Sequence, residues 1–272
     1  ITPVGGANAA EPWSALIAVD DIPPESTAIH GITAAHALAT GQAVAGVLVT
    51  AAALLTASLA AGVPIVGMNL SFDLTILDRE CRRWGLSPLC GLPPAPVVDV
   101  MVIDRALDKY RSGKRTLSDL CAVYGVKHDG AHNATEDALA AARIAYRMGQ
   151  LGQAGHEELA RHYAARRFPH EIARAWQAFG RLTLAELHVE QGRWYAEQTE
   201  GLAAYWRRLA VEARDRANAP AINDESRDIA VQEAEELERR VETLAPSWPL
   251  RPYVVVEATD GSNGYAAALR QS

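Results

Sequence analysis

Cysteine, methionine and phenylalanine are scarce in this chain: each occurs three times in 272 residues, and aromatic residues make up 6% of the total. Cys81, Cys90 and Cys121 are odd in number and have no Cys-x-x-Cys spacing. This pattern excludes a disulfide framework and a cysteine-based zinc site, and it predicts reduced thiols in a cytoplasmic protein. The composition, 49% apolar and 22% charged, is otherwise ordinary for a globular protein.

An excess of basic residues is also missing. The chain has 26 Lys and Arg against 33 Asp and Glu, a net charge of −7, so any contact with nucleic-acid phosphates must be local. The most basic stretch runs from Arg105 to Arg115, where only Asp108 opposes the positive charges. Such a run is usually a solvated face, although phosphate binding requires a local patch of this kind.

No stretch of the chain favours a membrane span. The nearest candidate, from Ala43 to Met68, consists largely of Ala, Thr, Ser and Gly, is interrupted by Pro64 and has no flanking Lys or Arg. A buried helix followed by a strand fits this stretch better. The chain begins with Ile1 and shows no signal-peptide pattern, so we expect a cytoplasmic protein.

Strand and helix signals alternate as far as Leu151 and predict an α/β domain over residues 1–151. The predicted elements are a helix over 45–60, a buried strand over 63–68, a helix from Asn69 to Trp84, an apolar run over 96–103 and a hairpin, cut in its first strand, from 1–4 and 13–19. Asn133 and Glu136 have capping-box spacing and mark the start of a further helix.

Residues 152–250 are expected to form a helical extension, with helices over 156–167, 184–214 and 224–244, and residues 251–272 a tail. The helices are expected to pack as a hairpin or bundle. One face of the longest helix carries Leu184, Leu187, Gln191, Trp194, Gln198, Leu202, Tyr205 and Leu209.

Three polar residues could carry chemistry. Asp73 lies at one strand-to-helix junction, and His132 and Asp137 lie at the start of another helix. Carboxylates at such positions can bind hard divalent cations, and a nearby histidine can deprotonate a water for attack on phosphorus, as two-metal phosphodiester hydrolysis requires. Each residue taken alone is more often a helix cap or a charge that complements the helix dipole.

These residues stand in motifs that resemble a known family. Asn69-Leu70-Ser71-Phe72-Asp73 looks like the second motif, and His132 through Asp137 like the third, of the DEDDh 3'-5' exonucleases, which include the epsilon proofreading subunit of replicative DNA polymerase. Segments 28–33, 98–99, 113–117 and 124–126 match the family in the same order. The resemblance covers residues 1–151. The helical remainder, including 197–198 and 247–250, is more weakly similar to extensions in actinobacterial and actinophage members.

The resemblance implies a ribonuclease H-like fold, with a mixed sheet and flanking helices, that releases nucleoside 5'-monophosphates from DNA 3' ends. It implies that Asp73 and Asp137 bind two Mg²⁺ or Mn²⁺ ions and that His132 is the general base. Contacts with nucleic acid are expected from Phe72, Asn69, Lys114 and Arg115. The implied partners are single-stranded or frayed 3' ends and a replicative polymerase.

The first motif of the family, an Asp-x-Glu at the end of the first strand, is not found. Asp20 and Asp21 are followed by Ile22, and Asp78-Arg79-Glu80 falls inside a predicted helix. We therefore expect the first strand to lie upstream of Ile1. These 272 residues alone are expected to be inactive and poorly stable, because two metal ligands and an interior strand are missing.

Two alternatives stay open. A degenerate, non-catalytic module that binds nucleic acid or assists a polymerase would also lack the Asp-x-Glu motif, and its helical region would recruit the partner. An RNA-trimming exonuclease of the same family would keep the catalytic residues, because recognition of the 2'-hydroxyl cannot be seen in these motifs.

Overall fold

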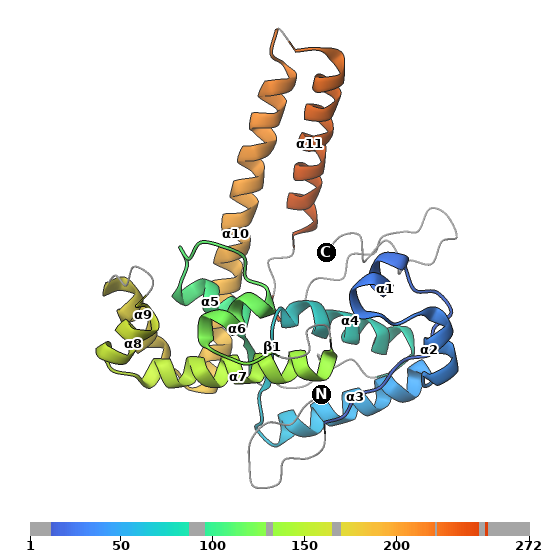
Figure 1. Cartoon of the computed structure of the whole chain (residues 1–272), viewed down its shortest axis with the longest axis vertical. Coiled ribbons are helices and arrows are strands. Elements are labelled where there is room, and N and C mark those ends of the chain that lie inside the picture. The colour runs from blue at the N-terminus through green and yellow to red at the C-terminus, as the bar shows by residue number, and fades with distance from the viewer. Residues whose placement is uncertain are drawn as a thin grey trace. The chain divides into compact units, whose positions relative to one another are not determined.

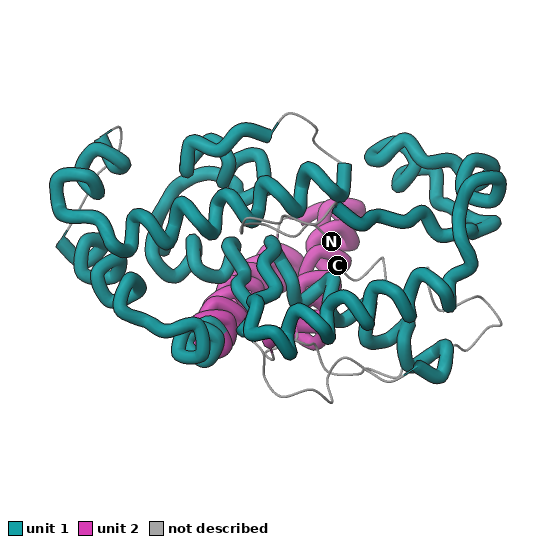
Figure 2. The backbone as a smooth tube through the Cα atoms, turned by 90° about the horizontal axis from the view of Figure 1, so that it is seen from below, with its two compact units in different colours: residues 1–191 teal, residues 192–272 magenta. Residues whose placement is uncertain are grey.

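A computed structural model describes residues 12–86, 96–128, 133–164, 170–220, 222–244 and 248–249. The chain divides into two compact units, Ile1–Gln191 and Gly192–Ser272 (Figure 2). The division falls inside one long helix. The predicted domain boundary near Leu151 stays a prediction.

Helices dominate the first unit (Figure 1). In chain order its elements are α1 (Pro24–His30), α2 (Ala34–Thr40), α3 (Val44–Ala60), β1 (Ile65–Gly67), α4 (Leu70–Arg83), β2 (Val97–Asp99), α5 (Val100–Leu107), α6 (Leu117–Tyr124), α7 (Ala134–Gln153), α8 (His156–His162), α9 (His170–Phe179) and the first turns of α10 (Leu184–Ala217). The predicted helices at α3, α4 and α7 are confirmed. Among the described residues, no helix combines the length and the apolar character that crossing a bilayer requires.

Two short strands form the sheet of the described residues. β1 and β2 are parallel, with Ile65 paired to Val97 and Gly67 paired to Asp99. Parallel neighbours require a crossover connection, and α4 lies within it. A helix-rich unit with a small parallel sheet is compatible with the predicted α/β domain. The mixed sheet implied by the resemblance is not seen in this part of the chain, where the pairing of the two strands is parallel.

The predicted strand over residues 13–19 is wrong. Ile17 makes a single parallel bridge to Gln42, in which the Ala18 N–H donates to the Gln42 carbonyl and the Gln42 N–H donates to the Leu16 carbonyl. The pairing stops there because Ala43, the next residue, is the N-cap of α3. The other half of the predicted hairpin, residues 1–4, lies outside the described residues.

The apolar run over 96–103 is divided between a strand and a helix at Asp99. The Asp99 side chain accepts hydrogen bonds from the backbone N–H groups of Met101 and Val102, which makes Asp99 the N-cap of α5. A short, fully buried run has no periodicity that separates strand from helix. The position of the capping side chain therefore decides where β2 ends.

The core of the first unit is built around α7. Its buried residues are Ala140, Ala141, Ile144, Met148 and Leu151, and the helix packs against α6, α9 and β1. α4 packs against α3, and its buried side chains include Leu70 and Leu74. The two helices whose first turns carry the predicted site residues are therefore anchored in the core.

Two of the three cysteines are described. Cys81 and Cys121 are buried free thiols, and burial raises the pKa of both. The predicted reduced state of the thiols stays a prediction. Cys90 lies outside the described residues.

The second unit is a helical hairpin made by the later turns of α10 and by α11 (Asp224–Thr243) (Figure 1). Small side chains are buried on both helices: Ala203, Ala210, Ala213, Ala217, Ala230 and Ala234. Arg214 on α10 donates two hydrogen bonds, of 2.9 and 2.7 Å, to the carboxylate of Glu238 on α11. The predicted hairpin is confirmed.

The predicted apolar face of α10 is buried in part. Leu187 and Gln191 are buried, but Leu184, Leu202 and Tyr205 are exposed. In the later turns the buried positions are the alanines, which a pattern of large apolar residues overlooks. The buried face therefore changes along the helix.

Candidate functional site

One carboxylate, that of Asp99, joins the starts of two helices. Its Oδ1 accepts hydrogen bonds from the N–H groups of Asn69 (3.0 Å), Met101 (3.0 Å) and Val102 (3.4 Å), and its Oδ2 accepts from Leu70 (2.9 Å). Met101 and Val102 begin α5, whereas Asn69 and Leu70 begin α4. Helix N-termini favour negative charge. Asp99 is 1% exposed, so this double cap is part of the core.

Burial raises the pKa of Asp99, while the four backbone donors oppose the rise because they stabilise the ionised form.

The arrangement at the start of α4 shows that Asp73 is not a helix cap. The N-cap position belongs to Asn69, which has a left-handed backbone (φ 59°) and makes no capping hydrogen bond with its side chain. The carboxylate of Asp99 accepts the hydrogen bonds of the N–H groups of Asn69 and Leu70 instead. The N-cap interpretation of Asp73 is therefore wrong, whereas its position in the first turn of α4 agrees with a charge that complements the helix dipole.

Asp73 lies in the first turn of α4 and is exposed to solvent. Desolvation by the surrounding chain nevertheless raises its pKa to about 6; a backbone hydrogen bond lowers it, and the charge of Asp99 adds a smaller rise.

Asp137 occupies the corresponding place in α7. Asn133 is the N-cap of that helix, and its Oδ1 accepts hydrogen bonds from the N–H groups of Thr135 (3.0 Å) and Glu136 (3.3 Å). The predicted helix start is confirmed. Asp137 follows in the first turn, with its side chain 35% exposed.

A histidine that sequence analysis did not single out holds Asp137. Nε2 of His128 lies 2.6 Å from Oδ1 of Asp137, and the His128 side chain is 7% exposed. The second carboxylate oxygen of Asp137 is not part of this contact. His132, the predicted general base, lies outside the described residues. His128 stands four positions before His132 in the sequence, and only its contact with Asp137 sets it apart.

The Asp78-Arg79-Glu80 segment does not replace the missing first motif. Asp78 is buried and accepts a hydrogen bond from Nε of Arg82 (2.9 Å), and Glu80 accepts one from Arg83 (3.3 Å). Both pairs join neighbouring turns of α4. These carboxylates therefore stabilise their own helix.

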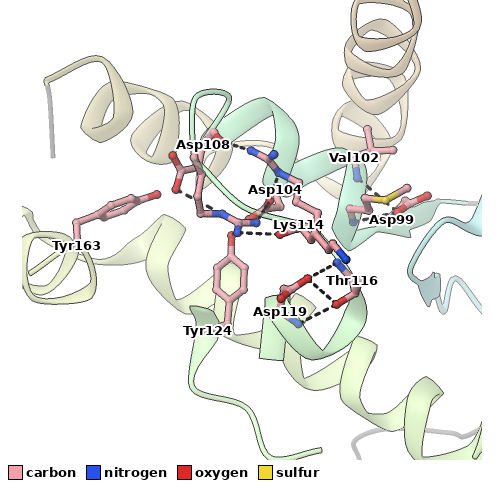
Figure 3. Close-up of polar contacts among 12 residues, drawn as sticks. Asp99, Val102, Asp104, Asp108, Lys114, Thr116, Asp119, Tyr124 and Tyr163 are labelled. Carbon is pink, nitrogen blue, oxygen red and sulfur yellow. Dashed lines mark hydrogen bonds and ion pairs between the residues drawn. The ribbon is translucent and has the colours of Figure 1, made fainter. Parts of the chain in front are cut away.

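The basic run is not simply a solvated face. Nη2 of Arg111 and Nε of Arg115 lie 2.6 and 2.8 Å from Oδ2 of Asp104, and the Tyr124 hydroxyl donates to Oδ1 at 2.9 Å (Figure 3). Asp104 is fully buried, and the two arginine side chains are only 6% and 15% exposed. Burial and the charge of Asp104 raise the pKa of Tyr124 well above its usual value, so its hydroxyl stays neutral and donates.

This ion-paired cluster gives Arg115 an internal role, and its predicted contact with nucleic acid stays a prediction. Lys114, in contrast, is exposed, and its carbonyl accepts a hydrogen bond from Nη1 of Arg111 (3.4 Å). Tyr110 is 90% exposed, and Nζ of Lys109 lies 5.7 Å from the centre of its ring. The loop between α5 and α6 therefore presents two lysines and an aromatic ring to solvent.

The two remaining predicted contact residues lie at the start of α4. Asn69 and Phe72 are both half-buried, and the Phe72 N–H donates to the Asn69 carbonyl at 2.9 Å. Asn69, Phe72 and Asp73 therefore belong to one short, hydrogen-bonded turn.

Asp73 and Asp137 have the type of side chain that binds a hard divalent cation. Carboxylate oxygens are the ligands that Mg²⁺ and Mn²⁺ prefer, and both side chains reach solvent. Within the described residues, however, no three His, Cys, Asp or Glu side chains come together as a possible metal cluster. The described part of the chain therefore supplies a fraction of such a site.

The chain was compared with known protein families. The family model described as Exonuclease matches residues 9–145, half of the chain, and contains both helix starts described above. The chain belongs to the exonuclease family, whose members are nucleases that hydrolyse phosphodiester bonds and generally use divalent metals. Comparison with curated proteins and with solved structures gives no match.

Proposed function

We propose that this member of the exonuclease family is a DNA 3'-5' exonuclease with a ribonuclease H-like fold, of the DEDDh type. The family match supports a nuclease. One observation carries the finer proposal: Asp73 and Asp137 occupy equivalent places in the first turns of α4 and α7, and neither is used as a cap. Carboxylates that reach solvent from anchored helices suit a hydrolytic site on the surface of the unit.

In this proposal Asp73 and Asp137 hold Mg²⁺ or Mn²⁺. A bound divalent cation would neutralise phosphate charge and lower the pKa of a bound water. His132 accepts the proton of the attacking water, and a nucleoside 5'-monophosphate leaves from the DNA 3' end. His128 orients the carboxylate of Asp137, and Asp99 fixes the turn that carries Asp73.

The substrate is proposed to be a single-stranded or frayed DNA 3' end in the cytoplasm. Asn69 and Phe72 lie in the same turn as Asp73, and they are therefore the proposed contacts of the terminal nucleotide. Lys114 supplies a local positive charge, as an acidic chain requires. Arg115, which is bound to Asp104, is proposed to contact the nucleic acid beside Lys114. A replicative polymerase is the proposed partner.

A second candidate is a non-catalytic nucleic-acid-binding module. It is favoured by the local ion pairs of Asp78 and Glu80, which leave no Asp-x-Glu segment of the described residues for metal binding. For the same reason we expect these 272 residues by themselves to hydrolyse DNA weakly or not at all.

The test uses matched single-stranded DNA and RNA oligonucleotides with a 5' label. Each is incubated with Mn²⁺ and either the 272-residue chain or the product of the complete reading frame. The proposal predicts that the product of the complete reading frame shortens the DNA from its 3' end and releases 5'-mononucleotides. Preferential shortening of RNA would favour the RNA-trimming alternative. Binding without shortening by both chains would favour the non-catalytic module.

A further inference from the structure

A side chain of α10 pairs with the backbone of β2. Nε2 of Gln191 donates to the Val97 carbonyl at 2.8 Å, and Oε1 of Gln191 accepts from the Asp99 N–H at 2.7 Å. Gln191 is fully buried. Its carboxamide offers one donor and one acceptor, as a peptide group does, so it takes the place of a neighbouring strand on this side of β2.

The orientation of this carboxamide is fixed from both ends. Nε2 of Gln191 also donates to the Leu187 carbonyl at 3.1 Å, so both amide hydrogens are used. A reversed amide would place a donor against the Asp99 N–H. One turn earlier, Nδ1 of His188 accepts from the Val97 N–H at 3.2 Å, and desolvation lowers the pKa of His188, which favours the neutral form that can accept.

Asp99 is therefore held on two sides. Gln191 fixes its backbone, and the N–H groups of Asn69 and Leu70 bind its side chain. Asn69 adopts the left-handed conformation, which asparagine tolerates better than most other non-glycine residues, and the hydrogen bond from its N–H to Asp99 holds it in place. A movement of Asp99 would release this residue and, with it, the turn that carries Asp73.

We propose that Gln191 is a positioning residue of the nuclease site, acting through Asp99 and the start of α4 on the carboxylate of Asp73. This inference rests on the proposed function, which it deepens. Gln191 lies in the first turns of α10, outside the family match, which ends at residue 145. A residue outside the matched region would therefore help to position the site. The competing explanation is that Gln191 only covers a strand edge.

The first experiment is hydrogen exchange on the full chain with Gln191→Met, which keeps the length of the side chain but removes its hydrogen bonds. The matched control is Gln232→Met, at an exposed position of α11. We expect the amides of Asn69 and Leu70 to exchange on the order of tenfold faster in Gln191→Met, the effect of one lost hydrogen bond. The amide of Ile144, in the core of α7, should change less than about twofold. Unchanged exchange at Asn69 and Leu70, or an equal increase at Ile144, would overturn the inference.

The second experiment is a double-mutant cycle on Mn²⁺ affinity, measured by calorimetry on folded protein. Gln191→Met should weaken binding several-fold in the wild-type background and have no effect in the Asp73→Asn background. Equal weakening in both backgrounds would contradict an action through Asp73. Absence of Mn²⁺ binding by the wild-type chain would count against the proposed metal site, and the exchange experiment would then decide the inference alone.

If Gln191→Met fails to fold, amide hydrogen exchange in the wild-type chain still tests the inference. If Gln191, Asp99 and the start of α4 form one unit, the amides of Asn69, Leu70 and Asp99 open with the same free energy. Exchange at Asn69 and Leu70 that is faster than at Asp99 by more than about tenfold would overturn the inference.

Discussion

Asp99 binds the Leu70 N–H at 2.9 Å, although the two residues are 29 positions apart in the sequence. This contact crosses from the end of β2 to the start of α4 and determines where that helix begins. The first turn of α4 carries Asp73. The geometry of the proposed site therefore depends on a carboxylate that is not itself a predicted metal ligand.

Replacing that carboxylate should be costly. In Asp99→Asn the amide group faces N–H donors, so at least one of the four backbone hydrogen bonds is lost inside the core. We expect a loss of roughly 2–3 kcal/mol in the free energy of unfolding, measured by urea denaturation. The control, Asp119→Asn, changes a capping carboxylate at the exposed start of α6, where water can replace the lost hydrogen bonds, and should cost clearly less. Equal losses would contradict the central role of Asp99.

Lys114 and Arg115 are neighbours in sequence with opposite expected effects. Arg115→Ala leaves the buried Asp104 with one arginine partner, so the chain should lose roughly 2–4 kcal/mol of stability. Lys114→Ala removes an exposed charge and should change stability by less than about 0.5 kcal/mol. Thermal unfolding of the two variants separates these outcomes.

Binding of nucleic acid is expected to depend on Lys114. Fluorescence anisotropy with a labelled single-stranded oligonucleotide should show weaker binding and a smaller salt dependence for Lys114→Ala. Unchanged binding in Lys114→Ala would remove this loop from the proposed interface.

The pKa of Asp73 predicts a pH dependence of stability. The unfolded chain loses this proton near pH 3.8 and the folded chain near pH 6, so the folded state binds more protons between these values. The wild type should therefore lose stability relative to Asp73→Asn as pH rises from about 4 to about 6, and the difference should be constant above that range. Solvent exposure limits the effect to less than about 1 kcal/mol. Urea denaturation across this range is the measurement, and a difference that grows in favour of the wild type would contradict the raised pKa.

Local signals in the sequence were sufficient for several elements. The capping spacing of Asn133 and Glu136 predicted the start of α7, where Asn133 is the N-cap. These features depend on neighbouring residues. The hydrogen bond from the Met101 N–H to Asp99 is likewise local, because the two residues are close in sequence. The hydrogen bond from the Asn69 N–H to Asp99 joins distant parts of the chain, and residue spacing does not predict it.

Other parts depend on distant contacts and were not predictable. The basic run was interpreted without Asp104, which lies just before it and neutralises Arg111 and Arg115 from inside the fold. Gln191 was placed on an apolar face, but it is buried because it binds β2. Burial of a polar side chain requires a partner, and the partner is known only from the structure.

The most direct test of the account measures how fast a 5'-labelled single-stranded DNA is shortened from its 3' end in Mn²⁺. Four forms of the product of the complete reading frame are compared: wild type, Asp73→Ala, Asp137→Ala and the control Asp228→Ala, which changes an exposed residue of α11. The account predicts a loss of more than about 100-fold for Asp73→Ala and Asp137→Ala, because even outer partners of metal ligands contribute roughly 10- to 100-fold. The control should match the wild type. Shortening that persists in Asp137→Ala or Asp73→Ala would contradict the account.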